Sequence, residues 1–167
     1  MSSFTRFDAA VSVQFDPEAS KVMGSEHWRL MTGFRYYVGA KDSSIYVDIP
    51  RNYITDFASV PWFVRSLVPR HGAHGQSAVL HDWLCEHLYV WKLVNGTPTK
   101  VTIKRKDVDK IFYESMAVSG VSVVRRTLIR IGVDGFRIVT NPTRATISRK
   151  KSELQTKYDI DDKIAAI

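Results

Sequence analysis

A chain of 167 residues with 44% apolar side chains is long enough for one substantial core and too short for two comfortable domains. Its single cysteine, Cys85, excludes an internal disulfide framework and a zinc site built on paired cysteines. No apolar stretch reaches the roughly 20 residues of a membrane span, and the first residues carry no signal-peptide pattern, so we expect synthesis in the cytoplasm.

The formal net charge of +7 is concentrated in the C-terminal part of the chain. Residues 1–99 carry nine basic and nine acidic side chains, whereas residues 100–137 carry nine basic and four acidic ones. A basic half of this kind can contact nucleic acid or an acidic protein partner, and it can equally be the solvated face of helices.

The N-terminal part of the chain predicts β-strands. Between residues 4 and 47, β-branched and aromatic residues recur with a period of two, and the stretches are separated by Asp16-Pro17, Gly24-Ser25, Gly33 and Gly39, which are typical turn residues. We expect a small antiparallel meander with strands at residues 11–15, 28–31, 34–38 and 44–48.

The middle of the chain predicts a loop followed by a buried helix. Residues 49–69 contain three prolines and fit an ordered loop with at most one helical turn near Pro61, and residues 70–75 fit a connector. Residues 76–89 show apolar side chains at helical spacing with few charges, so this helix is expected to be largely buried. Residues 90–101 look like a hairpin-like excursion, to which we assign no chemistry.

Two further helices are predicted before the C-terminal tail. Residues 105–119 form an amphipathic pattern that ends at Gly120. The next helix starts near Ser122, with Val124, Leu128 and Ile131 expected to face inward and Arg125, Arg126 and Arg130 outward as candidate binding residues. Gly132 and Gly135 are expected to break it.

Together these patterns predict an α+β fold. Residues 1–140 are expected to be a single domain in which a small antiparallel N-terminal sheet packs against about three helices. Residues 141–167 are expected to be an extended, basic and polar tail that is either mobile or docked on a partner, because the tail is too polar to form a core by itself.

Four acidic or imidazole side chains stand where a core is expected. Asp56 lies in the proline-rich loop, His81 and Asp82 lie within the apolar helix, and Asp109 lies beside the apolar seam of the next helix. A buried carboxylate or imidazole without a partner costs several kcal/mol, so such groups pair with one another or bind a cation or ligand. We therefore expect these three segments to meet in space.

Two interpretations of this constellation remain open. In the first, Asp56, His81 and Asp82, with His71, His74 or Asp109 as a further ligand, hold a divalent metal such as zinc or manganese that activates water. In the second, the same residues form a structural polar network in which Asp56 caps a turn with help from Ser59. Further candidate binding residues are Thr55, Ser59 and Asp109.

Three motifs carry a resemblance to a known family. Residues 52–61 (Asn-Tyr-Ile-Thr-Asp-Phe-Ala-Ser-Val-Pro), His81-Asp82-Trp-Leu, and residues 109–116 (Asp-Lys-Ile-Phe-Tyr-Glu-Ser-Met) occur in this order. The chain resembles, from about Ile49 to Gly132, the DUF1353 family of phage and prophage proteins. The resemblance implies a phage context, with the host cytoplasm or a phage particle as the location, and no particular reaction.

Two functional hypotheses follow. The favoured one is a phage-type accessory or virion-associated protein that binds a larger assembly through its basic C-terminal half, with a protein as the expected partner and nucleic acid as the other. The alternative is a small metal-dependent hydrolase whose site is built on Asp56, His81 and Asp82.

Overall fold

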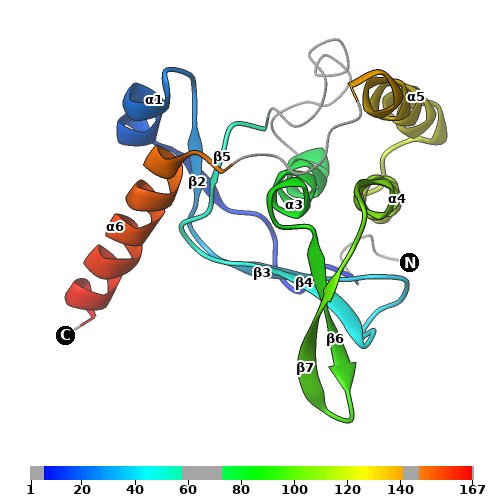
Figure 1. Cartoon of the computed structure of the whole chain (residues 1–167), viewed down its shortest axis with the longest axis horizontal. Helices are drawn as coiled ribbons and strands as arrows, with labels where there is room; N and C mark the ends of the chain where they lie inside the picture. Colours follow the sequence, from blue (N-terminus) through cyan, green and yellow to red (C-terminus); the bar gives the residue numbers. More distant parts are fainter. Residues whose placement is uncertain (1–5, 58–72, 141–146, 167) are drawn as a thin grey trace.

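The computed structural model of the chain describes residues 6–57, 73–140 and 147–166. Within these ranges it is a mixed α+β structure with two antiparallel sheets and five helices, as the sequence predicted (Figure 1). The elements in chain order are β1 (Val13–Phe15), α1 (Pro17–Met23), β2 (Trp28–Leu30), β3 (Phe34–Tyr37), β4 (Ile45–Ile49), β5 (Ile54–Thr55), α3 (Ala73–His87), β6 (Tyr89–Val94), β7 (Thr97–Thr102), α4 (Arg105–Val118), α5 (Val123–Thr140) and α6 (Arg149–Ala165).

The four strands predicted near the N-terminus are present, but they do not form one meander. β1 and β2 join β5 in a three-stranded sheet, and β3 and β4 join β6 and β7 in a four-stranded sheet. The chain leaves one sheet for the other at Gly33, where an added Cβ would lie 2.9 Å from the carbonyl oxygen of Ile49. The single meander was therefore wrong, because strands later in the sequence supply the missing neighbours.

The N-terminal part also contains a helix that the sequence analysis missed. Asp16-Pro17, which we interpreted as a turn, is the start of α1. The Asp16 side chain accepts a hydrogen bond from the Ala19 backbone amide at 2.9 Å, and Pro17 occupies the first turn, where its missing N–H costs nothing. Helix α1 ends at Gly24, whose φ of 80° is the left-handed conformation that glycine favours.

Helix α3 is the central element of the larger core. It begins at Ala73 rather than residue 76 and ends at His87, and residues 75–85 are buried. It packs against α4 and β4. The excursion predicted after it is a β-hairpin, and β6 of this hairpin pairs with β4 through Tyr46 and Trp91. Of the predicted proline-rich loop, residues 58–69 lie outside the described part of the chain, as do residues 70–72 of the connector.

Helix α4 follows the prediction closely, whereas α5 differs from it in two ways. In α4 the predicted apolar residues Val108, Ile111, Phe112 and Met116 are all buried. Helix α5 continues through both Gly132 and Gly135 to Thr140, so the predicted break was wrong.

The orientation predicted for α5 was also wrong. Its buried residues are Ile129 and Val133, which pack with Phe112 and Met116, whereas the residues expected to face inward are exposed. The reason is that α5 carries apolar residues on two opposite faces, and the short turn from α4 places the Ile129 face on the core. Val121, which is buried in that turn, donates its backbone N–H to the Met116 carbonyl oxygen.

The part of the predicted C-terminal tail that the structure describes is helical rather than extended. Residues 149–165 form α6, which lies beside α1 (Figure 1). Leu154 and Tyr158, one helical turn apart, are buried against Ala19 and Ile54. Two inward-facing apolar side chains are enough to dock this polar helix, because the rest of the chain provides the surface on which they pack. None of the helices in the described ranges is long and apolar enough to cross a membrane.

Candidate functional site

The polar side chains of α3 reach two different neighbours. His81 and Asp82 are adjacent in sequence and both buried, but they contact different elements. Adjacent residues on a helix point about 100° apart, so one side chain faces α4 while the other faces β5. The candidate site is therefore two linked polar clusters rather than one.

The first cluster connects the loop motif to the His-Asp motif. The Thr55 hydroxyl donates a hydrogen bond of 2.5 Å to the Asp82 carboxylate and accepts one of 3.0 Å from the Phe57 backbone amide. Phe57 has a φ of 55°, an uncommon value for a bulky residue, and this amide hydrogen bond helps to fix it. Asp56, between these two residues, is partly exposed. Thr55 therefore provides the contact that we expected between the two motifs.

The second cluster connects α3 to α4 and α5. His81 Nε2 lies 3.3 Å from Asp109 Oδ1, and Arg137 Nε lies 2.8 Å from Asp109 Oδ2. The imidazole also stacks on the Phe112 ring, with 4.4 Å between the ring centres. Burial lowers the pKa of His81, although its hydrogen bond with Asp109 opposes this, so the imidazole is neutral at pH 7. Asp109 therefore receives its compensating charge from Arg137.

Arg137 was not singled out from the sequence. It contacts Asp134 at 2.7 Å as well as Asp109, so it bridges two carboxylates. The available signal was the acidic residue three positions earlier on the same helix, a spacing at which side chains meet. The predicted break at Gly132 and Gly135 hid this signal, because it placed Arg137 outside the helix.

A third polar group, also missed, joins α6 to α3. Glu86 accepts a hydrogen bond of 2.9 Å from the Tyr53 hydroxyl and one of 2.6 Å from the Lys151 ammonium. Lys151 is buried and lies 4.3 Å from the centre of the Tyr53 ring. Burial, with the nearby Glu86 charge, raises the pKa of Tyr53. The polar C-terminal segment is thus anchored one helical turn from Asp82.

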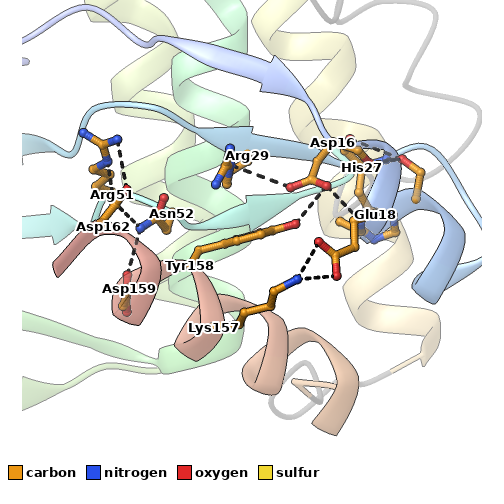
Figure 2. Close-up of polar contacts among 12 residues, drawn as sticks. Asp16, Glu18, His27, Arg29, Arg51, Asn52, Lys157, Tyr158, Asp159 and Asp162 are labelled. Atoms are coloured by element: carbon orange, nitrogen blue, oxygen red, sulfur yellow. Dashed lines mark hydrogen bonds and ion pairs between the residues drawn. The ribbon is translucent and has the colours of Figure 1, made fainter. Parts of the chain in front are cut away.

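Helix α6 makes a second row of polar contacts with the N-terminal elements (Figure 2). The Tyr158 hydroxyl donates to Asp16 at 3.0 Å, and Lys157 contacts Glu18 at 2.8 Å. Farther along, Asn52 donates hydrogen bonds to the carboxylates of Asp159 and Asp162 at 3.0 and 2.9 Å. Hydrogen bonds and an ion pair along this interface hold a helix whose composition is mostly polar.

The predicted metal centre is not present among the described side chains. No three His, Cys, Asp or Glu residues in the described ranges are placed so that they could hold a metal ion, so Asp56, His81 and Asp82 do not form such a centre by themselves. Two residues of the wider candidate set, Ser59 and His71, lie outside the described ranges, as does the side chain of His74. A zinc or manganese site that includes them stays a prediction.

The three predicted binding arginines lie on α5 in different settings. Arg125 is exposed. Arg126 and Arg130 both place their guanidinium groups about 5 Å from the ring centre of Tyr113, at 5.1 and 5.2 Å. Arg126 also donates to the Val121 carbonyl oxygen at 3.0 Å, so it holds the turn before α5 in place. Of the three, Arg126 is thus engaged within the chain, whereas Arg125 and Arg130 are exposed.

These features define a mixed α+β protein with a buried polar network around a central helix and an exposed face on α5. The chain belongs to the family described as "Protein of unknown function (DUF1353)", whose model matches residues 28–133, more than half of the sequence. Neither a curated protein nor a solved structure matches the chain. The matched segment contains Thr55, His81, Asp82 and Asp109, whereas α1 and α6 lie outside it.

Proposed function

We propose that this protein works by binding, as an accessory or virion-associated component that docks on a larger phage assembly. The phage context rests on the family resemblance of the three motifs, and such a component would be made in the host cytoplasm. The observation that carries the binding proposal is the exposed apolar face of α5.

This face is a regular seam. Val124, Leu128, Ile131, Gly135 and Ile138 are separated by alternating steps of four and three residues, which is the spacing of the contact positions in a coiled coil. The exposed fractions of Val124, Ile131 and Ile138 are 72%, 64% and 73%. Scattered exposed apolar residues are ordinary, but a row of them along one helix marks an interaction surface.

The charge of α5 favours one kind of partner. The helix carries four arginines and one aspartate, and Arg125 directly follows a seam position. Two copies of α5 packed on each other would bring like charges together, which disfavours a homodimer through this seam. We therefore assign the seam to a helix of another protein, with apolar residues at the same spacing and acidic residues beside them.

A pair of exposed isoleucines allows a matched test. Ile131 lies in the seam with 64% exposure, and Ile164 lies on α6 with 65% exposure. The probe is a designed helical peptide with leucine at the seam positions and glutamate beside them, compared with a peptide that carries lysine instead. We expect the glutamate peptide to bind. Ile131→Ser should weaken this binding at least about tenfold, because a buried isoleucine contributes more than about 1.4 kcal/mol. Ile164→Ser should leave the binding unchanged.

The proposal fails if the glutamate peptide does not bind, or if both serine variants behave alike. It also fails if Ile131→Ser abolishes instead a concentration-dependent self-association, adsorption to anionic vesicles or binding of single-stranded DNA. Those results would assign the face to a second copy, a membrane surface or nucleic acid.

The alternative function is a small metal-dependent hydrolase. The observation in its favour is the Thr55–Asp82 hydrogen bond, which holds the loop that carries Asp56 against the helix that carries His81. Under this alternative the purified protein retains zinc or manganese, chelation lowers its melting temperature, and His81→Ala abolishes metal retention. Absence of retained metal together with an unchanged melting temperature would discard it.

A further inference from the structure

A pocket between α4 and α5 is separate from the exposed seam. Its volume is about 180 Å³, and Phe112, Met116 and Val133 are among its apolar lining residues. Its charged lining consists of four cations and two carboxylates, namely Lys106, Lys110, Arg130, Arg137, Asp109 and Asp134. Pockets for drug-sized ligands occupy about 300–1,000 Å³, so this pocket limits its ligand to a molecule smaller than a typical drug.

The carboxylates of the pocket are already engaged. Arg137 holds Asp109 through Nε at 2.8 Å and Asp134 through Nη2 at 2.7 Å. The neutral imidazole of His81 lies behind Asp109 and adds no charge. These contacts keep the arginine in one orientation, with its side chain only 25% exposed.

The remaining cations lie nearer to solvent. Arg130 lies 3.5 Å from Asp134 and over the Tyr113 ring, and Lys110 contacts Asp107 at 3.0 Å. Lys106 makes no ion pair with any residue in the described ranges. Four lining cations against two lining carboxylates leave a formal excess of two positive charges.

We propose that this pocket binds a small phosphate monoester, with the phosphate among the lining cations and the uncharged group against the apolar lining. A phosphate monoester is largely dianionic at pH 7 and can contact several of the lining cations at once, whereas a carboxylate or sulfate ester brings one negative charge fewer. Arginine and lysine are the usual protein ligands of phosphate, and a fixed arginine loses little freedom on binding.

The test uses phenyl phosphate as the probe and isothermal titration calorimetry as the readout. Phenyl sulfate has a similar shape and one negative charge fewer, and inorganic phosphate lacks the ring. We expect phenyl phosphate to bind best, because only this probe satisfies both the cations and the apolar lining. Binding should weaken when the pH falls from 7.5 to 5, because the phosphate then gains a proton.

Two arginines of α5 provide matched variants. Arg130 lines the pocket and Arg125 does not, so Arg130→Gln and Arg125→Gln remove the same charge from the same helix. Arg130→Gln and Lys106→Gln should each weaken phenyl phosphate at least about threefold, as the loss of one exposed charge contact does, and Arg125→Gln should not. Absence of binding, equal affinity for phenyl sulfate, or equal effects of the two arginine variants would overturn the proposal. None of these outcomes depends on the peptide binding proposed for the seam.

Discussion

His81 on α3 and Arg137 on α5 contact opposite oxygens of one carboxylate, that of Asp109, at 3.3 and 2.8 Å. Through this shared residue three helices are joined at a single buried point. The arrangement has a direct consequence for the response of the fold to acid.

We expect His81 to make the protein less stable below pH 6.5. Burial lowers its pKa in the folded chain, whereas the unfolded chain titrates near 6.5. The neutral imidazole therefore contributes stability above that pH, and the contribution is lost as the pH falls, by at most about 1.4 kcal/mol per pH unit.

The measurement is the free energy of unfolding from urea titrations between pH 7.5 and 5. The slope against pH should be smaller in His81→Gln than in the wild type, whatever the variant's absolute stability. Equal slopes would contradict the assignment.

The Thr55 hydroxyl should be essential to the contact between β5 and α3. Thr55→Val keeps the shape but removes the 2.5 Å hydrogen bond that the hydroxyl donates to the buried Asp82 carboxylate. A hydrogen bond to a charged group contributes about 1.5–3 kcal/mol, and we expect a loss of stability of that size. Thr55→Ser retains a hydroxyl and should lose markedly less stability. If chemical denaturation shows the same loss of stability for Thr55→Val and Thr55→Ser, packing rather than the hydrogen bond stabilises the contact between β5 and α3.

Two glycines should respond to alanine with opposite signs. At Gly135 an added Cβ meets nothing within 4 Å, and alanine favours a helix over glycine by about 0.5–1 kcal/mol, so Gly135→Ala should stabilise the fold. At Gly33 the added Cβ would lie 2.9 Å from the Ile49 carbonyl oxygen and 3.1 Å from the Arg51 amide nitrogen, so Gly33→Ala should destabilise it. Melting temperatures of both variants check this, and a shift of the same sign in both would refute it.

The Tyr158 hydroxyl should stabilise the docking of α6. Tyr158→Phe removes its hydrogen bond to the buried Asp16, which we expect to cost about 1–3 kcal/mol. Tyr89→Phe is the control, because the Tyr89 hydroxyl makes no hydrogen bond to any described residue. Hydrogen exchange of α6 amides should accelerate in the first variant and stay unchanged in the second. Unaltered exchange in both would show that the Tyr158 hydroxyl does not contribute to the docking of α6.

The sequence predicted helices and strands correctly where the pattern of apolar residues allowed only one interpretation. The strand Phe34–Tyr37 alternates clearly, and all four apolar residues expected to be buried on α4 are buried. Helix α5 was oriented wrongly because both Ile131 and Ile129 belong to plausible apolar faces, and only contact with Phe112 and Met116 decides between them. Such a contact is tertiary and has no local signal.

The candidate site was predicted in part for a similar reason. The cost of burying a charge correctly indicated that Asp109 would need a partner, and His81 is one. It could not indicate Arg137, because the choice among many cations depends on how the helices pack. Lys151 was hidden in a segment whose composition suggested no core at all.

The double role of Asp16 has a consequence for the order in which the chain folds during translation. One oxygen of its carboxylate caps α1 and also accepts the hydroxyl of Tyr158, a residue near the opposite end of the sequence. Helix α1 is therefore covered only after residues 149–165 have been synthesised. We expect a stalled nascent chain that lacks α6 to leave α1 accessible to protease, and a chain that includes α6 to protect it.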